Sequence, residues 1–198
     1  MAREKVARFR ELEYWGRPVP SLGEADARLL IVGLAPAAHG GNRTGRVFTG
    51  DRSGDWLYRA LHRFGFANQP HSFDRNDGLK LIDCYITAAL HCAPPLNKPE
   101  LQETENCRRY LLREWELLAQ VRVVVALGKL AFDAVWLLPS AREKRKRPAF
   151  QHGLEVSLHS RRTLIVSFHP SQQNTFTGKL TESMFDAVFF RCRQLLSD

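Results

Sequence analysis

The chain has 198 residues, of which 44% are hydrophobic, and a formal net charge of +8 at pH 7. This length supports a substantial core but not two ordinary domains, so we expect residues 1–198 to form one domain. No apolar run approaches the ~18 residues that a membrane-spanning helix needs, which argues against an integral membrane protein. The positive charge favours polyanions such as nucleic acid as partners, although it could also serve solubility alone.

The N-terminal segment, residues 1–15, is charged and helix-like and lacks the apolar core of a signal peptide. We therefore expect a soluble, cytoplasmic protein. The cysteines stand at positions 84, 92, 107 and 192, and in an intracellular chain they are expected to be free thiols or metal ligands rather than disulfides. Their spacing alone does not decide between these two options.

The predicted elements alternate between strands and helices. An apolar run at 27–33 predicts a buried strand, and after a long polar stretch helical spacing resumes at 53–64. Further strands are expected within 81–90 and at 121–127, 154–158 and 163–168, and further helices at 101–119, 129–138 (ended by Pro139) and 182–196. This order predicts an α/β fold, a three-layer α/β/α sandwich around a mainly parallel four-stranded sheet.

Two polar loops follow strands of this sheet, at the edge where α/β proteins bind ligands. The first loop, residues 33–51, is rich in glycine, which lets backbone approach a ligand closely, but it matches neither common nucleotide-binding glycine motif. The second loop, residues 169–180, places His169 directly after a strand and adds small polar residues and Phe176. Phe176 could wedge into a groove and Asn174 could read a base edge, or the segment is an ordinary surface loop.

Sequence motifs in these loops resemble a known family. The first loop reads GLAPAAHGGNRTGRVFTGD from residue 33 and the second reads HPSQQNTFTGKL, and further similarity lies in YWGRPVP (14–20), YITAALHCAPPLNKP (85–99) and VVVALGKLAFDA (123–134). In these segments the chain is similar to the uracil-DNA glycosylase superfamily, most closely to its family 5 of bacteria and archaea. The similarity covers almost the whole chain in order.

The resemblance implies a uracil-DNA glycosylase-like fold and a monofunctional DNA repair glycosylase. Such an enzyme inserts a loop into the minor groove of DNA, flips uracil out of the helix and hydrolyses its N-glycosidic bond, which leaves an abasic site for base excision repair. We therefore expect DNA as the partner, no membrane association, a monomer, and a location in the cytoplasm with the nucleoid. The DNA-binding residues implied are Arg43, Ser171, Gln173, Thr175, Phe176 and Lys179.

The base pocket implied by the resemblance is formed by Gly33, Leu34, Ala35, Phe48, Ala88 and Asn174. Phe48 would stack on the flipped pyrimidine, although it could instead belong to the core. Ala88 stands where a related family carries a base-reading Asn. Loss of that amide should relax selectivity, so hypoxanthine or xanthine could be accepted beside uracil.

Catalysis is assigned to Asp51, Asn97 and His169. Cleavage passes through an oxocarbenium-like sugar and a base anion, so the site needs a donor to the anion, here His169, and a carboxylate near the sugar or water. Leu34 and Ala35 occupy the positions at which other families carry an acid or amide. The resemblance implies that Asp51, which stands at the matching family position, supplies the carboxylate, with a helix N-cap as its alternative role. Asn97 could contact the base or orient a water.

Family 5 members carry a [4Fe-4S] cluster on four cysteines, two of them in an N-terminal CxxC. Cys92 and Cys107 match the later pair, whereas the N-terminal pair is absent from this sequence. Two explanations stay open: a shortened form of a cluster protein, or a member that has lost its cluster.

Two other functions compete with a glycosylase. A non-catalytic DNA-binding member of the same fold would keep the basic surface and the wedge loop without an active pocket. The joint presence of Asp51, Asn97 and His169 argues against it. A hydrolase of free nucleotides lacks a phosphate-binding or metal motif in this sequence.

Overall fold

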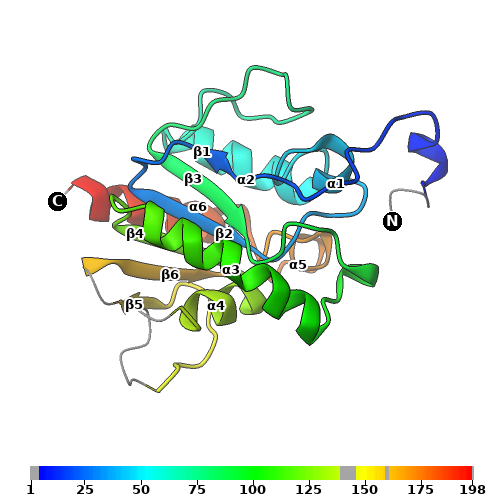
Figure 1. Ribbon diagram of the computed structural model, residues 1–198. Coiled ribbons are helices and arrows are strands. Elements are labelled where there is room, and N and C mark those ends of the chain that lie inside the picture. Colours follow the sequence, from blue (N-terminus) through cyan, green and yellow to red (C-terminus); the bar gives the residue numbers. More distant parts are fainter. Residues whose placement is uncertain (1–4, 139–145, 159–160, 198) are drawn as a thin grey trace.

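The computed structural model describes residues 5–138, 146–158 and 161–197 (Figure 1). Its elements, in chain order, are η1 (Ala7–Phe9), β1 (Leu22–Gly23), β2 (Leu29–Gly33), α1 (Gly41–Thr44), α2 (Arg52–Arg63), β3 (Cys84–Ala88), η2 (Pro95–Asn97), α3 (Leu101–Leu117), β4 (Val123–Leu127), α4 (Lys129–Trp136), β5 (Glu155–Ser157), β6 (Thr163–Ser167), α5 (Gln172–Phe176) and α6 (Glu182–Ser197). Pro139, which was expected to end a helix, lies outside the described residues.

The described strands form one six-stranded sheet in the order β1-β3-β2-β4-β6-β5. The four central strands run parallel, and β1 and β5 pair antiparallel at the two edges. The expected number of four strands is therefore wrong for the whole sheet and matches only its parallel centre. The strand that the sequence did not reveal, β1, has two residues, too few to show an alternating pattern.

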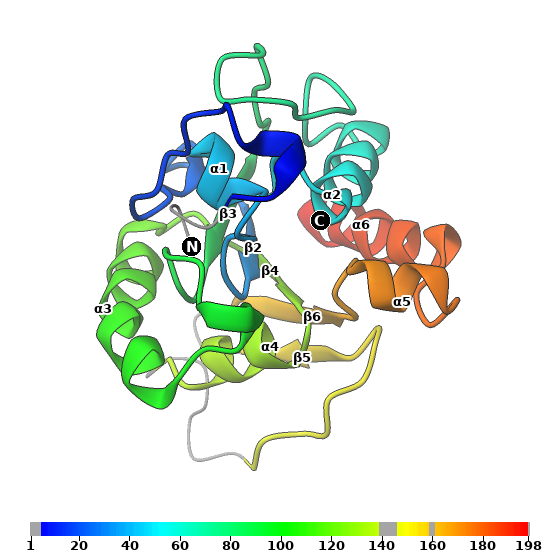
Figure 2. The ribbon, with the colours of Figure 1, turned by 90° about the vertical axis from the view of Figure 1, so that its right-hand side faces the viewer.

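The parallel strands are apolar on both faces because helices cover both faces. In β2, Leu29 and Ile31 belong to the core cluster shared with α2 and α6. The alternate residues, Leu30 and Val32, belong to the cluster shared with α3 and α4. Successive side chains of a strand point to opposite faces, so each strand supplies both cores. The three-layer arrangement predicted from the sequence is confirmed (Figures 1 and 2).

The long predicted helices are present, but the irregular segments hold more structure than expected. Two short helices, α1 and α5, lie inside the two polar loops, where four or five residues are too few to show helical periodicity. The helix-like N-terminal segment contains only the 3₁₀ turn η1 within its described residues. No helix in the described part of the chain is long and apolar enough to cross a membrane.

The carboxyl ends of the parallel strands meet at one edge of the sheet. The first loop with α1 follows β2 there, and His169 and α5 follow β6, so both loops face the viewer in Figure 2. Ala88 ends β3 at the same edge, and Gly128 follows β4. The fold thus brings segments that are more than a hundred residues apart in sequence to one site.

Candidate active site

A narrow pocket of about 40 Å³ lies at this edge of the sheet. Its walls come from both loops and from the ends of two parallel strands; the lining residues are Ala35, Pro36, Ala37, Val47, Phe48, Asp51, Ser53, Ala88 and His169. Five residues proposed from the sequence, Ala35, Phe48, Asp51, Ala88 and His169, are therefore together in one cavity.

The ring of Phe48 forms one wall of this pocket. Phe48 has a positive φ of 51°, a backbone conformation that costs a bulky residue energy and persists where surroundings hold it. Its ring lies directly over Gly33, where an added Cβ would come within 2.8 Å of Cζ. The ring also stacks with His169, with centroids 6.1 Å apart and an interplanar angle of 28°. The role of Gly33 is thus to leave room for this aromatic wall.

His169 stands opposite Phe48, directly after β6. Gly128, at the end of the neighbouring strand, has a φ of +93° and lies against it, so an added Cβ would be 3.2 Å from the His169 Cβ. Burial lowers the pKa of His169 to about 4. The imidazole is therefore neutral at physiological pH and keeps one N–H with which to donate a hydrogen bond.

Asp51 caps a helix and also lines the narrow pocket. Its Oδ1 accepts a hydrogen bond of 3.0 Å from the Gly54 amide and so caps α2. Its Oδ2 occupies the space that a side chain at position 40 would need, since a Cβ on Gly40 would lie 2.1 Å from it. Burial raises the pKa of Asp51, while the amides of Gly54 and Ser53 oppose this shift. The cap holds a carboxylate at the pocket wall.

A cleft of about 880 Å³ adjoins the narrow pocket, and Asp51 and Ser53 line both. The cleft runs between the two loops and also reaches the N-terminal segment and η2. Its lining includes three arginines, Arg8, Arg43 and Arg52, against two carboxylates, Asp51 and Asp55. Such a cleft suits a polyanionic strand whose reacting group enters the pocket.

Several residues expected to contact DNA line this cleft: Arg43, Ser171, Gln173 and Phe176. Arg43 also stabilises the first loop, donating to the backbone oxygens of His39 at 2.7 Å and Gly50 at 3.3 Å. Phe176 is 68% exposed, and the Arg52 guanidinium lies 4.3 Å from its ring centroid. Asn97 lines the cleft from η2, outside the narrow pocket, so it faces whatever occupies the cleft.

Other predicted residues lie beside the site rather than in its walls. The Asn174 amide donates to the His169 carbonyl at 2.9 Å and thus holds the second loop. The Leu34 carbonyl accepts from Leu90 at 2.9 Å and extends the β2–β3 pairing. Thr175 accepts from Arg52 at 3.5 Å, and the Lys179 ammonium lies 5.0 Å from the ring centroid of Phe168. These contacts support the loops that carry the pocket.

The predicted site set omitted several cleft residues, among them His39, Ser53 and Phe73. His39 lies within the first loop, and its Nδ1 is 2.9 Å from the Tyr14 hydroxyl. Phe73 is the only Phe, Tyr or Trp in the polar stretch from residue 67 to residue 81.

Cys92 and Cys107 are close enough for their charges to interact. Burial, followed by the proximity of Cys107 and Glu103, raises the pKa of Cys92. Among the residues that the structure describes, no group of three or more His, Cys, Asp or Glu side chains could hold a metal. A [4Fe-4S] cluster takes four thiolates, so this donor set does not fit one.

Comparisons with known proteins identify a family. A sequence model described as the uracil DNA glycosylase superfamily matches residues 20–192. A type-5 uracil-DNA glycosylase of Mycobacterium leprae is 51% identical over 98% of this chain and 86% of its own length. Type-5 enzymes of Thermus thermophilus (47% identity, 94% of this chain, 84% of theirs) and Pyrobaculum aerophilum (48%, 94% and 80%) are similar too. A type-4 enzyme of the latter organism is 29% identical over 80% of this chain and 74% of its own.

Proposed function

We propose that this chain, which belongs to the uracil DNA glycosylase superfamily, removes uracil from DNA in base excision repair. It hydrolyses the N-glycosidic bond and leaves an abasic site. The observation that carries the proposal is the narrow pocket holding Phe48, Asp51 and His169, which adjoins a cleft lined with arginines. We further propose that it acts as a monomer in the cytoplasm, on nucleoid DNA.

Base flipping follows from the shape of the site. A base stacked inside a duplex cannot bring its glycosidic bond to a pocket at the end of a sheet, so the nucleotide has to rotate out of the helix. Phe176 projects from α5 into the cleft and is the side chain positioned to fill the space that the base leaves. Phe48 then receives the extruded base against its ring face.

The chemistry needs charge stabilisation at two places. Negative charge develops on the leaving base, and the neutral imidazole of His169 can donate a hydrogen bond to its oxygen as that charge grows. Positive charge develops on the sugar, and the Asp51 carboxylate can stabilise it or take a proton from the attacking water.

A further part of the proposal concerns which damaged bases the enzyme releases. Ala88 presents a methyl group to the pocket, so this wall makes no hydrogen bond that would reject a purine edge. We therefore propose that hypoxanthine and xanthine are accepted beside uracil. Single-turnover cleavage of oligonucleotides that carry each base is the test, and release of uracil alone would refute this extension.

The glycosylase assignment is tested by alkali-sensitive strand cleavage at a defined uracil, with His169→Ala as the control variant. We expect abasic-site formation by the wild type and a rate lower by about 10²–10³ in the variant, as for loss of one oxyanion donor. Retained DNA binding without base release by the wild type would instead identify a non-catalytic DNA-binding member of the fold.

A further inference from the structure

The loop between α2 and β3 forms one wall of the cleft. An antiparallel bridge between Ala67 and Leu81 closes its base, and the intervening residues extend beyond the sheet at the top of Figure 1. Two of its residues, Ser72 and Phe73, line the cleft together with Phe176 of the second loop. Phe73 is 66% exposed, so most of this apolar ring faces solvent. Nothing in core packing accounts for a Phe at this position.

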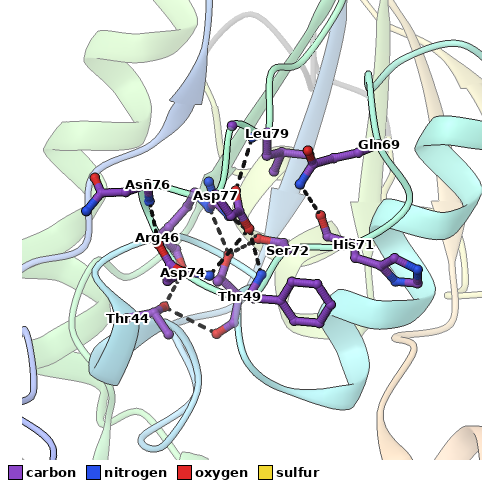
Figure 3. A network of polar contacts seen from close by, with 12 residues as sticks. Thr44, Arg46, Thr49, Gln69, His71, Ser72, Asp74, Asn76, Asp77 and Leu79 are labelled. Carbon is purple, nitrogen blue, oxygen red and sulfur yellow. Dashed lines mark hydrogen bonds and ion pairs between the residues drawn. The ribbon is translucent and has the colours of Figure 1, made fainter.

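A buried polar network holds this 67–81 loop against the first loop (Figure 3). The Arg46 guanidinium, on a residue only 5% exposed, donates 2.6 Å hydrogen bonds to the Asp77 carboxylate and the Ser72 hydroxyl. Its Nε donates to the Thr49 hydroxyl at 3.1 Å. Thr49 adjoins Phe48 in the chain, so the network connects the aromatic wall of the pocket to the wall of the cleft.

Asp77 also holds the backbone of the loop at Phe73 and at Leu79. It accepts hydrogen bonds from the amides of Phe73 at 2.7 Å and of Leu79 at 3.0 Å. Burial would raise the pKa of Asp77, but the Arg46 guanidinium and these amides hold it below its ordinary value. The carboxylate therefore stays ionised and paired at neutral pH. The backbone at Phe73 is thereby held beside the cleft.

The surroundings of Phe73 indicate which kind of molecule it contacts. Its ring stacks on His71, with centroids 5.6 Å apart and an interplanar angle of 25°, which makes a flat two-ring surface. The cleft it lines carries Arg8, Arg43 and Arg52. A flat aromatic surface beside a basic groove is the arrangement by which proteins bind single-stranded nucleic acid, because every base has a face that can stack. An apolar peptide, in contrast, would form no favourable electrostatic interaction with the three arginines.

We propose that Phe73, backed by His71, is a base-stacking contact for the DNA strand in the cleft, outside the pocket that receives the flipped base. This inference rests on the proposed function, because it takes the strand in the cleft to be the substrate. The Phe73 ring stacks on an unpaired nucleobase of that strand, while the Phe176 ring inserts into the duplex. The loop thereby binds single-stranded substrate and the unstacked part of a duplex alike.

The test measures binding of a uracil-free single-stranded oligonucleotide by fluorescence anisotropy. Phe73→Ala should raise the Kd about five- to tenfold, the scale of one lost stacking contact. Phe73→Tyr should restore binding, whereas Phe73→Leu should not, because Leu keeps apolar area without a π face. Phe190→Ala is the matched control: Phe190 is 56% exposed but lies on α6 against Phe64, so binding should not change.

Each possible result either supports or overturns the proposed stacking contact. Wild-type affinity in Phe73→Ala, or full rescue by Phe73→Leu, overturns the stacking contact. Quenching of a 2-aminopurine placed in the strand, lost in Phe73→Ala and present in Phe73→Tyr, supports it independently of affinity. The outcome is separable from the proposed function: base release by wild type with Phe73-independent binding removes only this inference. Phe73-dependent binding without base release removes only the glycosylase assignment.

Discussion

The two loops that form the site are held in different ways. The first loop is fixed by buried polar groups, with Arg46 bonded to Thr49, Ser72 and Asp77. The second loop is held by local contacts, namely the five-residue helix α5 and the side-chain amide of Asn174, and it leaves Phe176 largely exposed. The difference fits their tasks: a pocket that stabilises charge has to be preorganised, whereas a wedge has to adapt to DNA.

The largest expected effect is on the rate of base release, and it should separate the proposed catalytic role of Asp51 from its role as a helix cap. Asn caps a helix about as well as Asp, so Asp51→Asn should keep the stability of the protein while slowing base release by about 10²–10⁴, the range for general acid–base groups. Asp51→Ala should add a loss of about 1 kcal/mol in stability because the cap is gone. Single-turnover rates and thermal unfolding of both variants measure this. Unchanged release by Asp51→Asn would leave Asp51 as a helix cap alone.

The next effect tests how firmly the first loop is fixed. Arg46→Ala leaves the carboxylate of Asp77 buried without its partner and should cost about 3–5 kcal/mol in unfolding free energy. Arg113→Ala breaks the exposed ion pair with Glu116 on α3 and should cost less than about 1 kcal/mol. Urea unfolding compares the two. Equal small losses would show that the network does not fix the loop.

A smaller effect is expected in the second loop. Phe176→Ala should slow release of uracil from duplex DNA by about tenfold and affect single strands less, because only a duplex has to be unstacked. The same single-turnover assay on both substrates measures the difference. An equal loss on the two substrates would contradict the wedge and point to simple base stacking.

The smallest effect concerns pH. With a pKa lowered to about 4 from 6.5, His169 should give the rate no inflection near pH 6.5, and an inflection there would contradict a neutral donor. The pKa of His169 is higher in the unfolded chain than in the folded chain, so the imidazole is protonated at a higher pH when the chain is unfolded. Its contribution to stability is therefore complete above about pH 6.5 and falls as the pH drops towards 4. The acid limb of the rate should come from Asp51, whose pKa is raised, and should be absent from Asp51→Asn.

The amino-acid sequence by itself determined the parallel strands, the long helices and most of the pocket. Apolar runs and helical spacing are local patterns, and strand ends such as Gly33 and His169 mark the functional edge of a parallel sheet. Phe48 and Asp51 were predicted by resemblance and share one cavity with His169.

Only the tertiary structure decided which neighbours these residues have. Arg46 and Asp77 are 31 positions apart, and their pairing leaves no periodic signal in the chain. The side-chain amide of Asn174, which was predicted to read a base, also donates to the carbonyl of His169, a contact that the sequence did not indicate. Phe73 lines the cleft because the same pairing of Arg46 with Asp77 holds its loop there. Such contacts depend on how separate segments pack, which composition and spacing do not encode locally.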